Sequence, residues 1–206
     1  MSFFKKLGEL FKAPPPRDAH SNWFYYNKTF TKTLLIFYRS IIEKSRDGSI
    51  SLTAETIAPP ELRFNMSTAD VIKLWGKPRC SFNNNKEASN IQVFFYRRNF
   101  VYENALTQLQ FYNNRLFFCS VEVGKSMMAE NAKINMLNNM LPNYVSLENT
   151  TALSIPVYED ANHNFLLVQD EVLLNICYLS GEFAGNHLAL LEEAKKHAFE
   201  NNSLID

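Results

Sequence analysis

The segment 106–123, LTQLQFYNNRLFFCSVEV, limits the fold more than any other stretch of this 206-residue chain. Apolar and polar residues alternate along its first half, which is the period of a β-strand with one buried face. Asn113 and Asn114 tolerate the positive φ angles of a tight hairpin turn between two such runs. The sequence therefore predicts a group of three antiparallel strands, at 91–98, 106–112 and 115–123.

A short helix is indicated by the segment NMSTADVIKLWGKP. Ser67 is a good N-cap, and Asp70 three residues later completes a capping-box arrangement near the positive end of the helix. Gly76 suits the left-handed position that follows a helix, and Pro78 prevents its continuation. The predicted helix covers 67–75. Apolar residues at helical spacing predict four further helices, at 2–12, 28–46, 126–141 and 186–201.

A second group of strands is expected in the later part of the chain, at 152–160, 165–170 and 171–180. Residues 49–64 are expected to be irregular, because Pro59 and Pro60 exclude a regular element at their position. Aromatic residues make up 14% of the chain, and aromatic residues favour strands. We therefore expect an α+β fold, with an antiparallel β-meander sheet of five to seven strands and helices packed mainly on one face.

A proline run after the first helix divides the chain into a short opening segment and a body. Residues 1–16 are predicted to form an amphipathic helix and a stiff proline spacer. Residues 17–206 are predicted to form a single α+β domain. An alternative is two similar halves, 17–124 and 125–206, because each contains a helix, a proline and about three strands in the same order.

The first of these halves carries a motif with a known counterpart. A short helix ends in Leu-Trp-Gly-Lys-Pro at 74–78, a strand containing Tyr96 follows, and the hairpin continues with Leu-Gln-Phe at 109–111 and with Leu116. The segment 67–123 resembles the helix plus β-meander unit of outer-membrane-assembly lipoproteins and β-lactamase-inhibitor proteins. The resemblance implies a sheet that is presented to a protein partner without catalysis. The chain differs from those families in showing no recognisable signal peptide or acylated cysteine, so we expect a cytoplasmic protein.

Charge and motifs argue against several functional classes. The chain has 21 Lys and Arg residues and 21 Asp and Glu residues, so its formal net charge is zero. General nucleic-acid binding needs a basic surface, so we expect no nucleic-acid partner. The sequence has no G-x-S-x-G, C-x-x-C or H-x-x-x-H motif, and Gly-Lys-Ser at 124–126 lacks the earlier glycine of a phosphate-binding loop. We therefore expect no catalytic residue, cofactor or metal ion.

The opening helix is the first candidate for partner binding. Its apolar side chains form one stripe at helical spacing, which consists of Phe3, Phe4, Leu7, Leu10 and Phe11. Three roles are open for this stripe: packing onto the body, docking into a groove of a partner protein, or lying on a membrane surface. The membrane role is not favoured, because so short a helix with few lysines binds lipid weakly without a second anchor.

These observations predict a non-catalytic protein-binding module that acts as an adaptor, chaperone or inhibitor through its sheet and its opening helix. Arg97 and Arg98, which end a strand close to aromatic residues, are further candidate anchors for the partner protein. One alternative is an unrecognised enzyme or small-ligand-binding protein, with an aromatic-lined pocket around Trp75, Tyr96 and Tyr102. Another is a peripheral membrane protein anchored by the opening helix.

Overall fold

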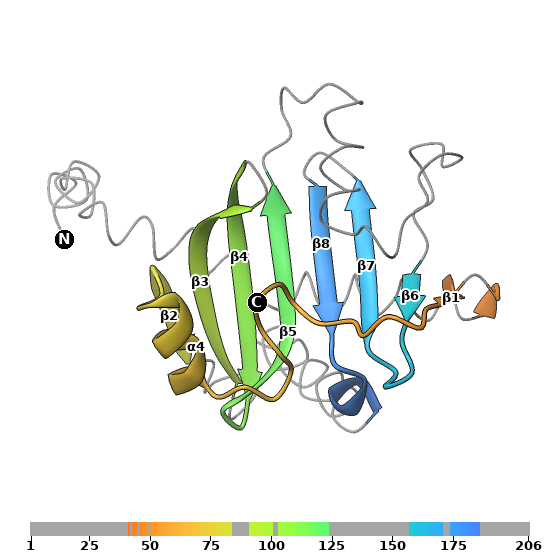
Figure 1. The fold of residues 1–206 in the computed structure, drawn as a ribbon, viewed down its shortest axis with the longest axis horizontal. Helices are drawn as coiled ribbons and strands as arrows, with labels where there is room; N and C mark the ends of the chain where they lie inside the picture. Colours follow the sequence, from red (N-terminus) through yellow and green to blue (C-terminus); the bar gives the residue numbers. More distant parts are fainter. Residues whose placement is uncertain are drawn as a thin grey trace, which may run out of the picture.

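A single eight-stranded sheet organises the part of the chain that the computed structural model describes, which comprises residues 41, 43–44, 46–48, 50–83, 91–100, 103–123, 157–170 and 174–185. The strand order is β1-β6-β7-β8-β5-β4-β3-β2 (Figure 1). The elements are the helix α4 (Thr68–Trp75) and the strands β1 (Ile50–Leu52), β2 (Cys80–Asn83), β3 (Ile91–Phe100), β4 (Glu103–Tyr112), β5 (Arg115–Val123), β6 (Val157–Glu159), β7 (Phe165–Asp170) and β8 (Leu174–Leu179). All neighbouring strands are antiparallel except β1 and β6, which are parallel. The described residues therefore have an α+β fold on a mostly antiparallel sheet.

The hairpin of β4 and β5 confirms the two strands and the turn predicted within 106–123. Asn113 and Asn114 form the turn with φ angles of 48° and 63°, which are left-handed values that asparagine tolerates. A β-bulge in this strand pair leaves one extra residue on β5. As a result the neighbouring side chains of Phe117 and Phe118 pack in the same core cluster instead of on opposite faces.

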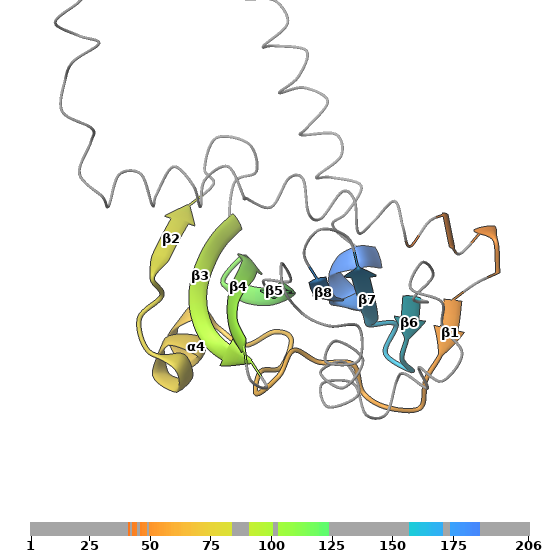
Figure 2. The same ribbon diagram turned by 90° about the horizontal axis from the view of Figure 1, so that it is seen from above.

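The sheet buries both of its faces. Side chains alternate along a strand, so the buried residues form two core clusters, one on each face. The first cluster includes Ile57, Leu62, Val71, Phe94, Leu109 and Phe111. The second cluster includes Ile41, Phe95, Phe118, Cys177, Leu179 and Phe183. Figures 1 and 2 show the segment between β1 and α4 crossing the first face, while residues 181–185 lie on the second.

Two strands of the sheet were not predicted. The region 49–64, expected to be irregular, contains β1, whose Ile50 pairs with Val157 of β6. β2 was missed as well, so the sheet has eight strands instead of five to seven. Both strands are three or four residues long and lie at the sheet edges. Such short strands form because they pair with a strand far along the chain, as β1 does with β6, or with a longer strand, as β2 does with β3. Local strand propensity does not reveal them.

The described helical segments lie on both faces of the sheet, in contrast to the expected packing mainly on one face. Val71 of α4 packs in the first cluster, whereas Ile41 and Phe183, both in helical backbone, pack in the second. The physical reason is that strands such as β5 bury side chains on both faces, so both faces need cover. None of the described helices is long and apolar enough to cross a bilayer.

Several predicted segments lie outside the described residues. They are the helices at 2–12, 126–141 and 186–201, most of the helix at 28–46, the proline spacer before residue 17, the beginnings of the strands at 152–160 and 171–180, and the Gly-Lys-Ser run at 124–126.

Candidate functional site

Helix α4 is held firmly at both ends. Ser67 Oγ accepts a hydrogen bond from the Asp70 amide (3.1 Å), and the Asp70 carboxylate accepts one from the Ser67 amide (3.2 Å), so the predicted capping box is confirmed. The Ser67 side chain hydrogen bond is the main cause that lowers the pKa of Asp70. The amide and hydroxyl of Thr68 both donate to Asn114 Oδ1, which ties the helix start to the β4–β5 turn. At the other end the Gly76 amide donates to the Ile72 carbonyl (2.8 Å).

Gly76 ends α4 in a backbone conformation that differs in detail from the predicted left-handed one. Its φ of 80° is positive as expected, but its ψ of −172° places it in a region that is open almost only to glycine. The chain leaves the helix in an extended direction and reaches β2 within four residues.

The helix leaves apolar side chains in contact with solvent. Val71 is fully buried, whereas Leu74 is 54% exposed and Ile72 is 36% exposed. These two side chains flank the side of the helix that faces the core, where Val71 is buried and Trp75 is partly buried. They do so because positions two residues apart in an α-helix are separated by about 200° around its axis. Positions 71–75 hold four apolar residues, which are too many for one buried face of so short a helix. This excess was the available sequence signal for an exposed apolar surface.

Arg98 joins α4 to β3 and to the segment between β1 and α4. Its guanidinium carbon lies 4.2 Å from the centroid of the Trp75 ring, in a cation–π contact. Its Nη2 atom forms a salt bridge of 3.0 Å with Glu61 Oε2, and Trp75 Nε1 donates to the same oxygen at 3.0 Å. Glu61 has a positive φ of 61°, and no sequence pattern indicated this position. We call the exposed surface formed by Ile72, Leu74, Trp75, Arg98 and Glu61 the α4 surface.

Tyr96 supports the α4 surface from beneath. Its hydroxyl donates to the Gly76 carbonyl (3.1 Å), and its ring meets the Trp75 ring edge-on with centroids 5.3 Å apart. Burial raises the pKa of Tyr96 to about 12, and the nearby charge of Arg98 opposes this only partly. Trp75 and Tyr96 therefore pack against each other, and the aromatic-lined pocket of the alternative, small-ligand interpretation stays a prediction. Tyr102, the third residue of that prediction, lies outside the described residues.

The two candidate arginines do not form one site. Arg97 lies opposite Leu106 and Arg98 lies opposite Ala105, so their side chains project from different faces of the sheet. Arg97 is exposed, and Arg98 is held in the α4 surface. The stripe of the opening helix lies outside the described residues, and its role in partner binding stays a prediction.

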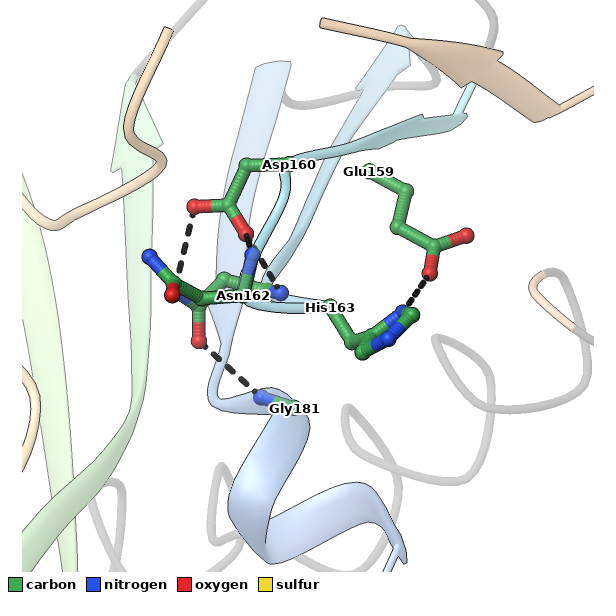
Figure 3. A network of polar contacts seen from close by, with 6 residues as sticks. Glu159, Asp160, Asn162, His163 and Gly181 are labelled. Atoms are coloured by element: carbon green, nitrogen blue, oxygen red, sulfur yellow. Dashed lines mark hydrogen bonds and ion pairs between the residues drawn. The ribbon is translucent and has the colours of Figure 1, made fainter. Parts of the chain in front are cut away.

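A buried carboxylate organises the turn between β6 and β7 (Figure 3). Asp160 is 4% exposed. Its Oδ1 accepts from the amides of Asn162 (2.8 Å) and Asn164 (2.9 Å). Its Oδ2 accepts from the Ile57 amide (2.7 Å) and from Asn164 Nδ2 (3.1 Å). With four donors this carboxylate has a structural role, and sequence reasoning missed it because Ile57 is 103 residues away.

The same turn approaches residues 181–185 closely. Asn164 Oδ1 accepts from the Gly181 amide at 3.0 Å. A Cβ atom on Gly181 would lie 2.2 Å from the His163 carbonyl oxygen, so only glycine fits there. The His163 side chain is 78% exposed and contacts Glu159 (Figure 3).

The reactive and metal-binding side chains of the described residues offer little chemistry. Cys80, Cys119 and Cys177 are all buried, and none of the three forms a disulfide bond. Burial raises the pKa of Cys177 to about 12 and raises that of Cys119 well above its usual value, so both stay as thiols near neutral pH. Among the described residues no group of three or more His, Cys, Asp or Glu side chains is arranged to hold a metal ion. Comparisons with known protein families, with curated proteins and with solved structures found no match to this chain.

Proposed function

We propose that this chain is a non-catalytic protein-binding module of the cytoplasm, with the role of an adaptor, chaperone or inhibitor. The observation that carries the proposal is the α4 surface, where exposed Leu74 and Ile72 lie beside an ordered Trp75–Arg98–Glu61 cluster. The opening helix, with its stripe of Phe3, Phe4, Leu7, Leu10 and Phe11, and the exposed Arg97 are proposed as additional contacts for the same kind of partner.

The composition of the α4 surface suits a protein interface. Tryptophan and arginine are enriched among the residues that dominate binding energy at interfaces. Here both are held by Glu61, so little side-chain entropy is lost when a partner binds. About half of Leu74 and a third of Ile72 are exposed, and covering both would contribute about 1.5–3 kcal/mol, as for one fully exposed apolar side chain.

The geometry of α4 indicates how a partner would bind. Leu74 and Ile72 flank the buried side of the helix, so a flat partner could cover only one of them. A partner with a groove could receive the outer side of α4 and cover both with its two walls, and the floor of that groove would need a polar or acidic group, because the exposed Lys73 lies between them on that side. The caps and the bond to Asn114 keep α4 helical before binding.

A division into two similar β-meander halves is proposed alongside this function. It is supported by the strand order, because β2 to β5 are consecutive neighbours, as are β6 to β8. The two groups join where β5 pairs with β8. A sheet shared in this way makes the body a single unit that presents α4 at one end and β1 at the other (Figure 1).

Two exposed leucines provide a matched test of the proposal. Leu74 lies on α4, and Leu52, which is 81% exposed, lies on β1 at the far edge of the sheet (Figure 1). Immobilised wild type, Leu74→Asp and Leu52→Asp chains would be incubated with native lysate, and the retained proteins would be quantified by mass spectrometry. We expect specific proteins that wild type and Leu52→Asp retain and that Leu74→Asp loses, with equal melting temperatures for all three chains.

The retained proteins would then be purified and titrated directly against the same three chains. If Leu74→Asp and Leu52→Asp bind each purified partner equally well, the α4 surface is not the binding surface. If wild type retains no protein above an unrelated control, the protein-binding function itself is rejected.

A further inference from the structure

A pocket of about 430 Å³ is lined by residues of the β4–β5 turn and of 181–185. These two segments lie at the same end of the sheet (Figure 1). The segment before α4 completes the pocket, because the Asn65 amide donates to the Leu116 carbonyl at 2.8 Å. Asn65 Nδ2 also donates to Glu182 Oε2 at 2.9 Å, which fixes one charged side chain of the lining. The volume is in the range of small-molecule sites, roughly 300–1,000 Å³.

One wall of the pocket is aromatic and already assembled. The rings of Phe117 and Phe183 stack with centroids 3.7 Å apart and an angle of 21° between their planes. The Tyr112 ring meets Phe183 edge-on at 5.6 Å. Phe183 is anchored by residues 181–185, whose start is fixed by the bond from Gly181 to Asn164. Phe117 and Phe183 are each only 3% exposed, so they support this wall from within the core, and the partly exposed Tyr112 is the ring on which a flat apolar group can pack.

The rest of the described lining is polar and carries both signs of charge. Arg115 contributes a guanidinium group, and Glu182 contributes a carboxylate. Glu182 accepts one hydrogen bond from Asn65, but a carboxylate has room for about four, so it can bind a further donor. Asn113, held at the turn by its positive φ, and the buried Ser180 add neutral polar groups.

We infer that this pocket binds a small zwitterion with an aromatic side chain, meaning an aromatic amino acid or a dipeptide that contains one. The carboxylate of the ligand pairs with Arg115, its ammonium group pairs with Glu182, and its ring packs against Tyr112, which Phe183 contacts edge-on. A phosphate or other dianion is disfavoured because Glu182 would repel it. A purely apolar ligand is disfavoured because it would cover Arg115 and Glu182 without hydrogen bonds.

A titration of the full chain with four probes tests the inference. L-phenylalanine and L-phenylalanyl-L-phenylalanine carry both charges, 3-phenylpropionate lacks the ammonium group, and 2-phenylethylamine lacks the carboxylate. We expect saturable binding of at least one zwitterion, with amide chemical-shift changes at Asn113 and at 181–183 in NMR spectra. Each singly charged probe should bind at least about tenfold more weakly, because it loses one charge-assisted hydrogen-bonding group.

Two variants test which residue pairs with each charged group of the ligand, and a third variant is the control. Arg115→Ala should weaken binding of the zwitterions and of 3-phenylpropionate and leave 2-phenylethylamine unchanged. Glu182→Gln can still accept from Asn65, and should weaken the zwitterions and 2-phenylethylamine only. Arg79→Ala, an exposed arginine outside the pocket lining, should change nothing.

Two results would overturn the inference. One is the absence of saturable binding of both zwitterions to the folded wild-type chain at low millimolar concentration. The other is equal affinity for the zwitterions and the singly charged probes, or equal loss of affinity in Arg115→Ala and Arg79→Ala. The pocket shares no residue with the α4 surface, so a failure of this inference can be told apart from a failure of the partner-binding proposal.

Discussion

Replacing Asp160 with asparagine is the most informative single change for the fold. The Asp160 carboxylate is almost fully buried and accepts four N–H groups, one each from Ile57 and Asn162 and two from Asn164. An asparagine side chain has nearly the same shape, but it has one acceptor oxygen, and its amide group is itself a donor. The substitution keeps the packing and removes half of the acceptor capacity.

The cost of this substitution follows from the bonds that remain. If the asparagine oxygen stays with the turn amides of Asn162 and Asn164, the Ile57 amide and the Asn164 side chain lose their acceptor. A hydrogen bond to a charged group contributes about 1.5–3 kcal/mol. Two such losses that are not fully additive should lower the free energy of unfolding by about 3–5 kcal/mol. That is a large share of the roughly 5–15 kcal/mol that stabilises a typical domain.

Urea unfolding, followed by circular dichroism, measures this difference. Glu159→Gln is the matched control, because it makes the same chemical change one residue earlier, where the carboxylate contacts only an exposed histidine among the described residues. The Glu159 side chain is only 18% exposed, but a glutamine keeps its shape and an acceptor oxygen for the His163 contact, so the control should change the free energy of unfolding by less than about 1 kcal/mol. A loss of less than about 1 kcal/mol for Asp160→Asn would refute the reasoning that this carboxylate anchors Ile57 and the segment before α4 to the β6–β7 turn.

Two further predictions concern a close approach and a titration. Gly181→Ala should lower the free energy of unfolding by about 1–3 kcal/mol, because the added Cβ would overlap the His163 carbonyl. Gly185→Ala is the control, because its Cβ meets nothing within 4 Å. Equal melting temperatures for the two variants would contradict the steric argument. Burial raises the pKa of Tyr96 from 10 to about 12. The stability that depends on the neutral Tyr96 hydroxyl is therefore fully present below pH 10 and is lost as the pH rises toward 12. In an absorbance titration, the tyrosine ionisation that Tyr96→Phe removes should have its midpoint near pH 12, and a midpoint near pH 10 would show that the ring is not buried.

Elements with local determinants could be predicted from the sequence. The β4–β5 turn needs two residues that tolerate positive φ, and Asn113 and Asn114 supply them. Helix α4 has its cap, its partner carboxylate and its stop signal within ten residues, and the structure places all three where the sequence indicated. In both cases the contacts that fix the backbone are made by near neighbours in the chain.

Features that depend on distant contacts could not be predicted. β1 exists because Ile50 meets Val157, and the buried Asp160 is explained only by an amide 103 residues earlier. The alternation that revealed the strands also suggested one buried face, whereas β5 is buried on both. For the candidate site, the sequence identified Arg98 and Trp75, but it could not show that Glu61 joins them.

The β4–β5 turn connects the two proposed binding sites. Asn114 accepts two hydrogen bonds from Thr68 and so positions the start of α4, while the adjacent Asn113 lines the pocket. Both asparagines have positive φ, so their side chains are placed by the turn itself and not by a flexible loop. A ligand in the pocket that contacts Asn113 would therefore restrain the same two-residue turn that holds α4. Because restraint of a shared element lowers the ordering cost at a second site, occupation of the pocket and binding at the α4 surface are expected to favour each other.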